Sequence, residues 1–514
     1  MDKRETLQTL TFGNQVAEEE RDILRDYFVK TQAWNRIFNG EIDIIYGPKG
    51  AGKSALYVLI QDHIDDLARR RIILIAAENP RGAPAFKSLV HEPPTSEREF
   101  IGIWKLYLVS LVARSLQSFS VDNKFARELY QILSENSLLA TNASSLGSIL
   151  RSVRAYVSRK LLAVGVETNV QFDPATGAPI FSGKIVFDEP DIAEQARGYL
   201  SVDDLLAKAS DALNAAGLQT WITLDRLDVA FDESTVLERN ALRALLRVYR
   251  DLRSYDTIRL KIFLRTDIWK RITEEGFREA THMSREHHIR WPKQALQNLI
   301  LRRLLSNAAI ISFYGIDKDK VLASSDKQDQ LFSQIFPDQV EVGENQSTTI
   351  DWLLKRTADG SKESQPRDII LFLNTRVEVQ NQRLERGEAE PTGPQLFERS
   401  SFKEALPALS EYRISRVLFA EYPELRPFID SMREQKTEHN SESLSRLWGK
   451  SPGEALTIAR KLRDIGFFEE RASRTSPTFW VPFLYRPYLS LVQGKAEDVA
   501  TQSAAARSDA LEDD

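Results

Sequence analysis

The sequence contains no cysteine, which excludes disulfides, thiolate metal sites and cysteine nucleophiles. It also lacks an apolar run long enough to cross a bilayer, because the stretch at residues 103–116 is interrupted by Lys105 and Arg114. No apolar segment follows residues 1–5, so neither a signal peptide nor a transit peptide is expected. We therefore predict a protein of the cytoplasm that has no membrane contact.

A strong charge of either sign is absent too. The chain has 69 Lys and Arg residues against 74 Asp and Glu residues, a net charge of −5. This balance argues against a surface that attracts nucleic acid or anionic membranes everywhere, but it permits a local basic patch. With 42% hydrophobic and 28% charged residues over 514 positions, we expect an ordinary globular protein of two to four domains.

Buried strands and amphipathic helices alternate through the first 290 residues. Continuous apolar runs, typical of strands buried on both faces, occur at residues 42–46, 72–77, 221–225 and 260–265. Helical patterns lie between them, and the alternation predicts an α/β three-layer sandwich. Residues from about 95 to 200 read as an insertion in this core, with helices followed by a β-hairpin whose strands are 166–172 and 180–187.

The strand pattern stops after residue 290, and composition suggests the remaining boundaries. We predict an N-terminal helical segment, an α/β core with the insertion, a helical region, a Pro/Gly-containing linker, a compact C-terminal unit and a disordered tail. The corresponding ranges are 1–40, 41–290, 291–385, 386–400, 401–493 and 494–514.

A phosphate-binding loop follows the first predicted strand. The residues Gly47-Pro48-Lys49-Gly50-Ala51-Gly52-Lys53-Ser54 match the pattern G-x-x-x-x-G-K-[ST] in full. The glycines let backbone N–H groups turn inward around a phosphate, and the helix predicted from Ser54 to about Ala68 adds its positive end. Ala55, in the first turn of that helix, is also predicted to contact the nucleotide. Lys53 would neutralise the β- and γ-phosphates, and the Ser54 hydroxyl would bind Mg²⁺. The loop predicts binding of ATP and Mg²⁺.

Such a loop needs a carboxylate at the end of a neighbouring strand to support the Mg²⁺ shell. The run at residues 221–225 supplies Asp225. The sequence does not decide which residue is the base that activates water, because Arg226 occupies the position after Asp225 where many relatives have an acid. We favour Asp228, with Glu78 at the end of an adjacent strand as the alternative, and a slow hydrolase without a proper base is the third interpretation.

Three arginine-containing features are candidates for sensing the γ-phosphate. Arg265 or Thr266 ends a buried strand, although a salt-bridged strand end is an equally good interpretation. Arg367 opens a helix and would reach the nucleotide from a lid, unless it is a solvated first-turn residue. The third candidate is an arginine finger that would act on a neighbouring subunit. It would come from the arginine-rich helix with Arg239, Arg243, Arg247, Arg250 and Arg253. A solvated or ion-paired helix face is the more frequent meaning of such a run.

On these residues the chain resembles P-loop ATPases of the AAA+/STAND-like branch, and within it a bacterial group known as "P-loop ATPase, Sll1717-type". The stretches that carry the resemblance are Phe12-Gly13 with Ala17-Glu18 and Tyr27–Val29, Gly47–Leu56, Leu224–Phe231, Phe263–Trp269, Pro366–Asp368 and Asp464–Phe468. The resemblance implies an ATPase core, a helical lid that carries a sensor arginine at Arg367, and a C-terminal winged helix. It places Phe12-Gly13 near the adenine and implies a regulatory or antiviral defence role.

The C-terminal unit has the pattern of a winged helix. Helices are expected at 411–421, 425–433, 441–448 and 452–465, followed by a β-wing from 467 to 483. Basic side chains that would meet DNA phosphates are Arg460, Lys461, Arg463, Arg471 and Arg474. Acidic neighbours dilute that charge, so a protein–protein module is the alternative. His282, Glu286, His287 and His288 match no common zinc spacing and are expected to form a polar loop.

Together these features favour an ATP-driven conformational switch that controls an effector protein or a homo-oligomeric assembly. A DNA-binding AAA+ motor that grips duplex through its winged helix is the second hypothesis. A scaffold that binds ATP and barely hydrolyses it is the third.

Overall fold

The structure is a computed structural model. It describes residues 2–29, 31–77, 96–139, 145–162, 171–172, 179–180, 184–186, 190–196, 199–227, 235–274, 276–471 and 477–496. No helix within these ranges is long and apolar enough to cross a membrane.

The chain divides into two compact units. The core unit contains Gln32–Pro48 and Lys53–Ile289, and the lid–wing unit contains Met1–Thr31, Lys49–Gly52 and Arg290–Asp514. The P-loop sequence is divided between the two units, because its tip, Lys49–Gly52, belongs to the lid–wing unit and its two ends belong to the core unit.

A five-stranded parallel sheet forms the centre of the core unit, with strand order β2-β7-β8-β1-β9. The strands are β1 (Ile44–Gly47), β2 (Ile72–Ala76), β7 (Gln219–Leu224), β8 (Ile258–Arg265) and β9 (Glu286–His288). The four strands expected from apolar runs are confirmed. The polar loop expected around His287 is wrong, because residues 286–288 pair with β1 as a short edge strand. Edge strands are often short and charged, which hides them from a hydrophobicity pattern.

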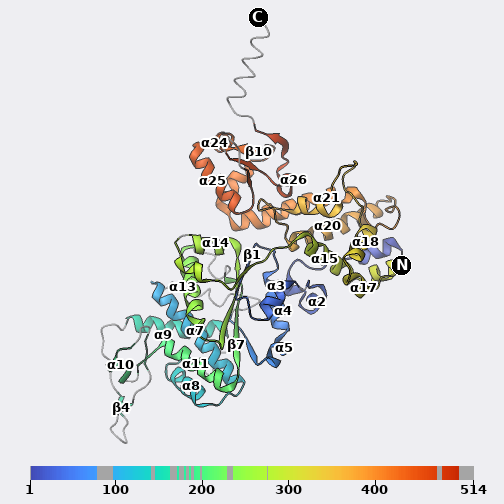
Figure 1. The fold of residues 1–514 in the computed structure, drawn as a ribbon. Helices are drawn as coiled ribbons and strands as arrows, with labels where there is room; N and C mark the ends of the chain where they lie inside the picture. The colour runs from blue at the N-terminus through green and yellow to red at the C-terminus, as the bar shows by residue number, and fades with distance from the viewer. Residues whose placement is uncertain are drawn as a thin grey trace. The chain divides into compact units, whose positions relative to one another are not determined.

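Helices cover both faces of this sheet (Figure 1). On one side lie α4 (Lys53–Asp62) and α5 (Ile64–Arg69); on the other lie α7 (Glu97–Ser118), α11 (Val202–Ala216) and α13 (Thr235–Leu252). Alternation along β8 explains the two layers. Ile262 and Leu264 join the large apolar core with α7, α11 and α13, whereas Phe263 meets Tyr57 of α4 edge to face at 5.9 Å. The α/β three-layer prediction is confirmed.

The predicted insertion contributes directly to the core. Trp104 of α7 donates its indole N–H to the Ala241 carbonyl at 2.9 Å, and the Tyr107 hydroxyl donates to the Ala77 carbonyl at 2.7 Å. Helices α8 (Lys124–Glu135) and α9 (Leu146–Leu162) follow. Of the predicted hairpin, the structure describes only a short antiparallel pair of β3 (Gln171–Phe172) and β4 (Pro179–Ile180). The second predicted strand is wrong at residues 184–186, which form β5 (Lys184–Val186) and pair in parallel with β6 (Tyr199–Ser201) instead. Residues 166–170 and 181–183 of the predicted strands lie outside the described residues.

The lid part of the lid–wing unit is helical. Its main helices are α15 (Lys293–Leu304), α18 (Ser325–Ile335), α19 (Thr349–Thr357) and α20 (Pro366–Glu385). The N-terminal helix α1 (Lys3–Thr9) and the following turn join the same apolar core through Leu7, Leu10 and Phe12. Leu396 and Phe397, within the predicted linker, are also buried in this core.

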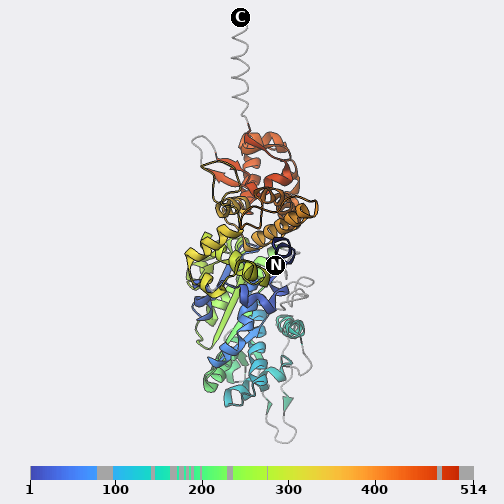
Figure 2. The same cartoon turned by 90° about the vertical axis from the view of Figure 1, so that its right-hand side faces the viewer.

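The C-terminal part has winged-helix topology, drawn in orange and red in Figures 1 and 2. In chain order its elements are α23 (Arg426–Asp430), β10 (Lys436–Asn440), α24 (Ser441–Trp448), α25 (Pro452–Asp464), β11 (Glu469–Arg471), β12 (Thr478–Trp480) and β13 (Val492–Lys495). The sheet order is β11-β12-β10-β13, and β11, β12 and β10 pair antiparallel. The winged-helix prediction is therefore confirmed.

Two predicted boundaries in this region differ from the structure. Residues 411–421 are helical as predicted, but they continue α21 (Arg399–Glu411) through a π-helical segment, η4 (Tyr412–Leu418), into α22 (Phe419–Glu421). The predicted disordered tail begins too early, because β13 runs to Lys495 and pairs with β10. Residues 497–514 lie outside the described part.

The lid and the winged helix are tightly joined within their unit. The Gly360 N–H donates to the Gly466 carbonyl at 2.6 Å, and a Cβ at Gly360 would lie only 2.1 Å from the Phe468 carbonyl oxygen. Glycine is the residue that permits such a close backbone approach. The loop before α20 is therefore fixed to the winged-helix fold.

Candidate nucleotide-binding site

The P-loop connects the end of β1 at Gly47 to the start of α4 at Lys53. Gly50 and Gly52 have φ values of +85° and +95°, in the left-handed region that side chains rarely adopt. A Cβ at Gly50 would also approach the Arg367 Cβ to 3.0 Å. The two glycines thus give the loop a backbone that a residue with a side chain would not readily adopt.

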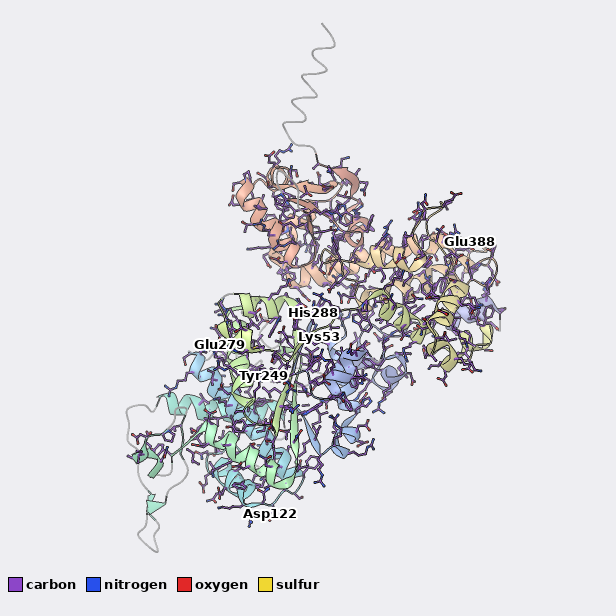
Figure 3. All side chains as sticks on the ribbon, in the orientation of Figure 1. Lys53, Asp122, Tyr249, Glu279, His288 and Glu388 are labelled. Carbon is purple, nitrogen blue, oxygen red and sulfur yellow. The ribbon has the colours of Figure 1, made fainter. Side chains whose placement is uncertain are left out.

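The charged and hydroxyl groups of the loop lie together in the core unit. The Lys53 Nζ donates to the carbonyls of Gly47 at 2.8 Å and Pro48 at 3.0 Å. Figure 3 labels Lys53 beside the sheet. The Ser54 hydroxyl donates to the Asp225 carboxylate at 3.1 Å, and Asp225 is only 6% exposed. The lysine lies against the loop that would hold the phosphates.

The Ser54–Asp225 pair fits a magnesium shell. Mg²⁺ prefers oxygen ligands at about 2.0–2.1 Å in octahedral geometry, which places neighbouring ligand oxygens about 3 Å apart. The Ser54 hydroxyl and the Asp225 carboxylate have that separation. These two residues would hold the ion directly or through its water, and the bound ion would supply neutralisation of the phosphate charge.

Neither candidate base can be placed, because Asp228 and Glu78 lie outside the described residues. The structure instead shows a backbone feature between the predicted Mg²⁺ ligand and Asp228. Arg226 has a φ of +59°, a left-handed conformation that costs a residue with a side chain about 1–3 kcal/mol. The chain therefore turns sharply at Arg226, directly after Asp225. Sequence reasoning noticed Arg226 for its charge and missed its conformation.

At the end of β8, Arg265 forms a bidentate ion pair with Asp267, with Nε–Oδ1 and Nη2–Oδ2 distances of 3.0 and 2.9 Å. The salt-bridged strand end, one of the two interpretations of Arg265, is therefore observed. The Thr266 hydroxyl lies 3.3 Å from the His288 Nε2. The strand end is thus a polar cluster in which Arg265 and Thr266 are held by different partners.

An aromatic stack lies beside the P-loop strand. Tyr46 of β1 stacks on His288 of β9 at 5.0 Å and on Trp269 at 5.2 Å between ring centroids. Burial lowers the pKa of the neighbouring His287, and burial raises that of the Glu286 carboxyl. The unpredicted strand β9 places His287 and His288 beside β1, the strand that leads into the P-loop, and His288 is the one that stacks on Tyr46. Among the described residues, no three or more histidine and acidic side chains are grouped so that they could hold a metal ion by themselves.

Within the lid–wing unit, the P-loop tip contacts three distant segments. Lys49 forms an ion pair with Glu421. The Arg367 N–H lies 3.5 Å from the Gly50 carbonyl oxygen, and the Trp291 indole N–H donates to the Ala51 carbonyl at 2.8 Å. The structure therefore places Arg367, the predicted sensor, beside the phosphate-binding loop.

The N-terminal segment completes this neighbourhood. The Arg367 Nε donates to the Gln15 carbonyl at 3.2 Å. Asn374 of α20 accepts from the Phe12 N–H and donates to the Gly13 carbonyl, both at 2.8 Å. Phe12 itself is fully buried in the lid core. Packing of Phe12-Gly13 near the adenine remains a prediction.

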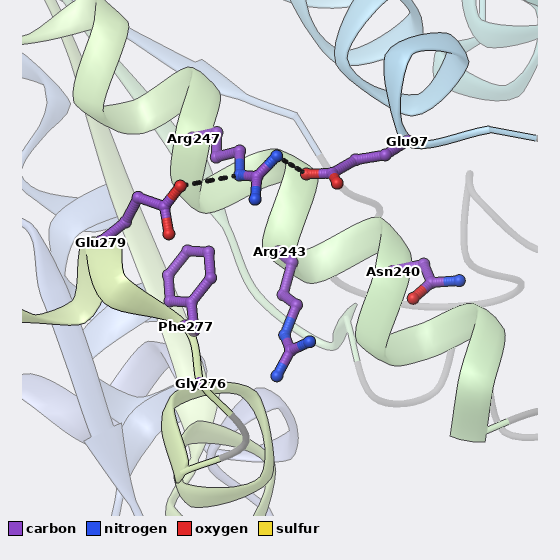
Figure 4. A pocket seen from close by; sticks show the side chains of 7 residues that line it. All are labelled: Glu97, Asn240, Arg243, Arg247, Gly276, Phe277 and Glu279. Carbon is purple, nitrogen blue, oxygen red and sulfur yellow. Dashed lines mark ion pairs between the residues drawn. The ribbon is translucent and has the colours of Figure 1, made fainter.

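The arginine-rich helix α13 is an ion-paired face. The predicted finger candidates were Arg239, Arg243, Arg247, Arg250 and Arg253. Figure 4 shows Arg247 between Glu97 and Glu279, with the Arg247–Glu279 pair at 3.1 Å. Arg243 points into the same cavity of about 280 Å³ and donates to the Ile272 carbonyl at 3.1 Å. Arg250 pairs with Asp251 at 3.7 Å, and Arg253, just beyond the end of α13, donates to the His282 carbonyl at 2.9 Å. These four arginines are engaged by partners in their own unit, which agrees with the ion-paired helix face.

No protein-family model matches the chain, and no curated protein matches its sequence. Solved structures align over nearly its whole length with low scores. The ORC1 protein of Aeropyrum pernix in complex with DNA has 13% identity and a TM-score of 0.35, covering 91% of this chain and 94% of that one. The A. pernix ORC2 protein, in ADPNP–ADP complexes, has 12% identity and a TM-score of 0.30, covering 92% and 93%. CDC6P from Pyrobaculum aerophilum has 12% identity and a TM-score of 0.30, covering 93% and 96%. Scores of this size do not establish a common function.

Proposed function

We propose that the chain binds ATP with Mg²⁺ and hydrolyses it. The observation that carries this proposal is the P-loop geometry, in which Gly50 and Gly52 form a left-handed cradle beside Lys53. The Ser54–Asp225 pair at 3.1 Å adds a site of the right size for Mg²⁺. The cradle binds phosphate oxygens, Lys53 neutralises them, and Ser54 and Asp225 orient the ion. Asp228 and Glu78 remain the candidates for the base that activates water.

We further propose that nucleotide state is transmitted to the winged helix. The P-loop tip contacts Arg367 at the first turn of α20, and the next residue, Asp368, lies 3.6 Å from Arg413 Nη1 in the π-helical segment η4. Such π-helical segments are frequent at functional sites. A movement of Gly50 on phosphate binding would displace Arg367 and, through Asp368, the segment that leads into the winged helix. This chain of contacts supports the switch hypothesis.

ATP turnover and ATP affinity test the proposal in the full chain, in Lys53→Ala and in Lys124→Ala, an exposed lysine of the same unit that serves as the matched control. Loss of phosphate neutralisation should lower turnover by about 10²-fold or more. Lys124→Ala should retain wild-type turnover. Turnover that survives Lys53→Ala would refute the assignment of the site. ATP binding without measurable turnover in the wild type would instead favour the scaffold hypothesis.

A DNA-binding AAA+ motor is the second candidate, favoured by the winged-helix topology of the C-terminal part. The charges of its last helix and wing speak against strong DNA contact. Arg463 pairs with Glu470 and with Asp464 at 2.7 Å, and Arg471 pairs with Glu469 at 2.9 Å. Binding of a DNA duplex at several salt concentrations is the test, because each neutralised phosphate adds to the slope of log K against log[salt]. Turnover that is indifferent to DNA, with no retention at low salt, would exclude the motor.

Homo-oligomer formation, an effector protein partner, and a role in bacterial signalling or antiviral defence are proposals that rest on the sequence resemblance. Native mass measurement with and without ATP tests the first of these. A mass that stays monomeric in both states would exclude an arginine finger donated by a neighbouring subunit.

A further inference from the structure

A small cavity lies in the core unit, at the edge of the sheet opposite the P-loop. Its volume is about 100 Å³. The end of α13 and the start of β8 form its walls together with Asp43, the residue before β1. The P-loop begins at the other end of β1, at Gly47. The length of β1 therefore separates the cavity from the phosphate-binding loop.

Three arginine side chains line this cavity, and each is held by a backbone carbonyl. Arg253 Nη1 donates to the His282 carbonyl at 2.9 Å. Arg259 Nη1 donates to the Gly40 carbonyl at 2.9 Å, and Arg285 Nη2 donates to the same oxygen. Two guanidinium groups thus converge on one oxygen atom, although their like charges repel each other.

The conformation of Gly40 makes this convergence possible. Its φ is +78°, in the left-handed region, and a Cβ at this position would lie only 2.8 Å from Arg259 Nη1. The Gly40 carbonyl has no net charge, so it fixes the positions of Arg259 and Arg285 without neutralising them. The backbone therefore holds two cations together at one wall of the cavity.

The acids near the cavity do not balance its cations. Asp43 also lines the cavity, but its Oδ1 accepts from the buried Lys261 at 2.9 Å and its Oδ2 lies 2.8 Å from Arg285 Nε. Asp256, the other acid of the lining, is exposed to water, which screens its charge. The three arginines and Lys261 supply four positive charges against these two carboxylates, which leaves an excess of two positive charges.

The pKa of Lys261 reflects this excess. Burial lowers it to about 8; Asp43 opposes the shift, whereas Arg285 and Arg259 add to it. An anion in the cavity would offset the repulsion among these cations. The cavity volume is that of roughly three water molecules, at about 30 Å³ each, which suits one tetrahedral oxyanion and is too small for a nucleotide.

We propose that this cavity binds a single phosphate ion. Arg253, Arg259 and Arg285 donate to its oxygens, because guanidinium N–H groups that carry a charge make strong hydrogen bonds to phosphate. The excess of positive charge selects an anion, and the volume selects a free ion over a phosphate that carries a large group. The site has no residue in common with the P-loop, so it goes beyond ATP binding and does not depend on it.

Equilibrium dialysis with ³²P-labelled inorganic phosphate tests the proposal. The full chain carries Lys53→Ala in every sample, which weakens the P-loop as a competing phosphate site, and saturable binding is expected. Arg253→Gln changes an exposed arginine of the lining and should weaken binding by about tenfold or more, because it removes charge-assisted donors. Asp256→Asn removes an acid of the lining and should strengthen binding by about threefold.

The matched control is Arg127→Gln, at an exposed arginine of α8 that does not line the cavity, and it should leave phosphate affinity unchanged. Equal affinity in Arg253→Gln, Asp256→Asn and Arg127→Gln would overturn the proposal, as would the absence of saturable binding. Thermal unfolding without phosphate shows whether Arg253→Gln folds like the wild type. If it does not, Asp256→Asn still decides, because phosphate affinity must rise there.

Unlabelled competitors identify the ligand. Sulfate has the same shape as phosphate and should displace the label. Stronger displacement by AMP than by sulfate would overturn the assignment to a free anion, since the cavity would then accept a phosphate that carries a nucleoside. Because Lys53 is replaced in every sample, failure of the P-loop assignment would not change the ranking of the Arg253, Asp256 and Arg127 variants.

Discussion

Each compact unit contains a buried cluster in which one charged group is shared by two groups of the opposite charge, and the two clusters have opposite compositions. In the core unit one carboxylate, Asp43, serves two cations: Lys261 Nζ at 2.9 Å and Arg285 Nε at 2.8 Å. In the lid–wing unit one guanidinium, Arg413, serves two carboxylates, Asp359 and Asp368, each at 3.6 Å. A tyrosine hydroxyl adjoins each cluster, Tyr249 on Asp43 at 3.2 Å and Tyr485 near Arg413 at 3.4 Å.

Burial shifts the pKa of one group in each cluster, and the shift makes that group's charged form less favourable. Burial lowers the pKa of Lys261, one of the two cations that share Asp43, to about 8. Burial raises the pKa of Asp368, one of the two acids that share Arg413, to about 6. The core cluster has ion pairs of 2.8–2.9 Å, whereas the two ion pairs of the lid–wing cluster are 3.6 Å long, and one of them involves the residue that follows Arg367. The difference indicates that the core cluster is the more tightly paired of the two.

The largest effect is expected for Arg413→Met. Removing the shared guanidinium leaves two carboxylates buried without a cation, which should cost about 3–5 kcal/mol of stability. Thermal unfolding followed by calorimetry measures the loss, and Arg413→Lys, which retains a cation, should recover a large part of it. Wild-type stability in Arg413→Met would mean that the two carboxyls are already protonated in the folded protein.

A smaller loss is expected for Asp43→Asn, about 2–3 kcal/mol. Lys261 can give up its proton because its pKa is already lowered to about 8, so the uncompensated charge is smaller than in the Arg413 variant. Asp256→Asn, an exposed acid of the same unit, is the control and should unfold like the wild type. If Asp43→Asn were the more damaging variant, the ranking of the two clusters would be reversed.

Asp368 should make the stability of the lid–wing unit depend on pH. Its pKa is raised to about 6 in the folded state, compared with about 4 in the unfolded chain. The stabilisation that comes from its bound proton is therefore complete below about pH 4 and is lost as the pH rises through about 6. Asp368→Asn should remove this loss and gain about 1–2 kcal/mol relative to the wild type between pH 4 and pH 7. Urea unfolding at several pH values measures the free energy of unfolding of both proteins. If the two free energies changed with pH in the same way, Asp368 would not be the source of the pH dependence.

The smallest effect is expected for another buried guanidinium, that of Arg376, which forms no ion pair with any acid in the described ranges. Arg376 of α20 is fully buried, its three nitrogens make no hydrogen bond among the described residues, and its guanidinium lies 3.4 Å from the Phe397 centroid and 4.3 Å from that of Phe402. Burial lowers its pKa. Arg376→Met should lower stability by less than about 1.5 kcal/mol, or raise it. The substitution removes cation–π contacts but breaks no ion pair and leaves no carboxylate without its partner in the described ranges. Thermal unfolding would refute this if the loss matched that of Arg413→Met.

Sequence reasoning succeeded where local chemistry dictates local structure. The P-loop could be predicted because its glycines are demanded by backbone conformation, and the four inner strands because burial on both faces leaves an uninterrupted apolar run. Asp225 was predicted as the acidic residue of the Mg²⁺ site because it stands at the end of such a run. The winged helix was predicted from helix patterns, although its first strand, β10 (Lys-Thr-Glu-His-Asn), was missed because its residues are polar.

Contacts between residues far apart in the chain could not be predicted in this way. Nothing near Lys49 in sequence points to Glu421, and nothing near Ala51 points to Trp291. Lys261 stands in an apolar run and Arg376 in an ordinary helix, yet both are buried because distant rings and carboxylates surround them. The left-handed Arg226 gave no signal either, since arginine does not favour that conformation.

The hydrogen bond from Trp291 to Ala51 has an optical consequence. The Trp291 indole donates its N–H to the Ala51 carbonyl of the phosphate-binding loop at 2.8 Å. An indole that exchanges a carbonyl partner for water changes its emission, so the chain carries a fluorophore on its phosphate-binding loop. With eight tryptophans in the sequence, the difference spectrum between wild type and Trp291→Phe isolates this signal. A change in the loop on nucleotide binding should therefore be readable from the spectrum of the unlabelled protein.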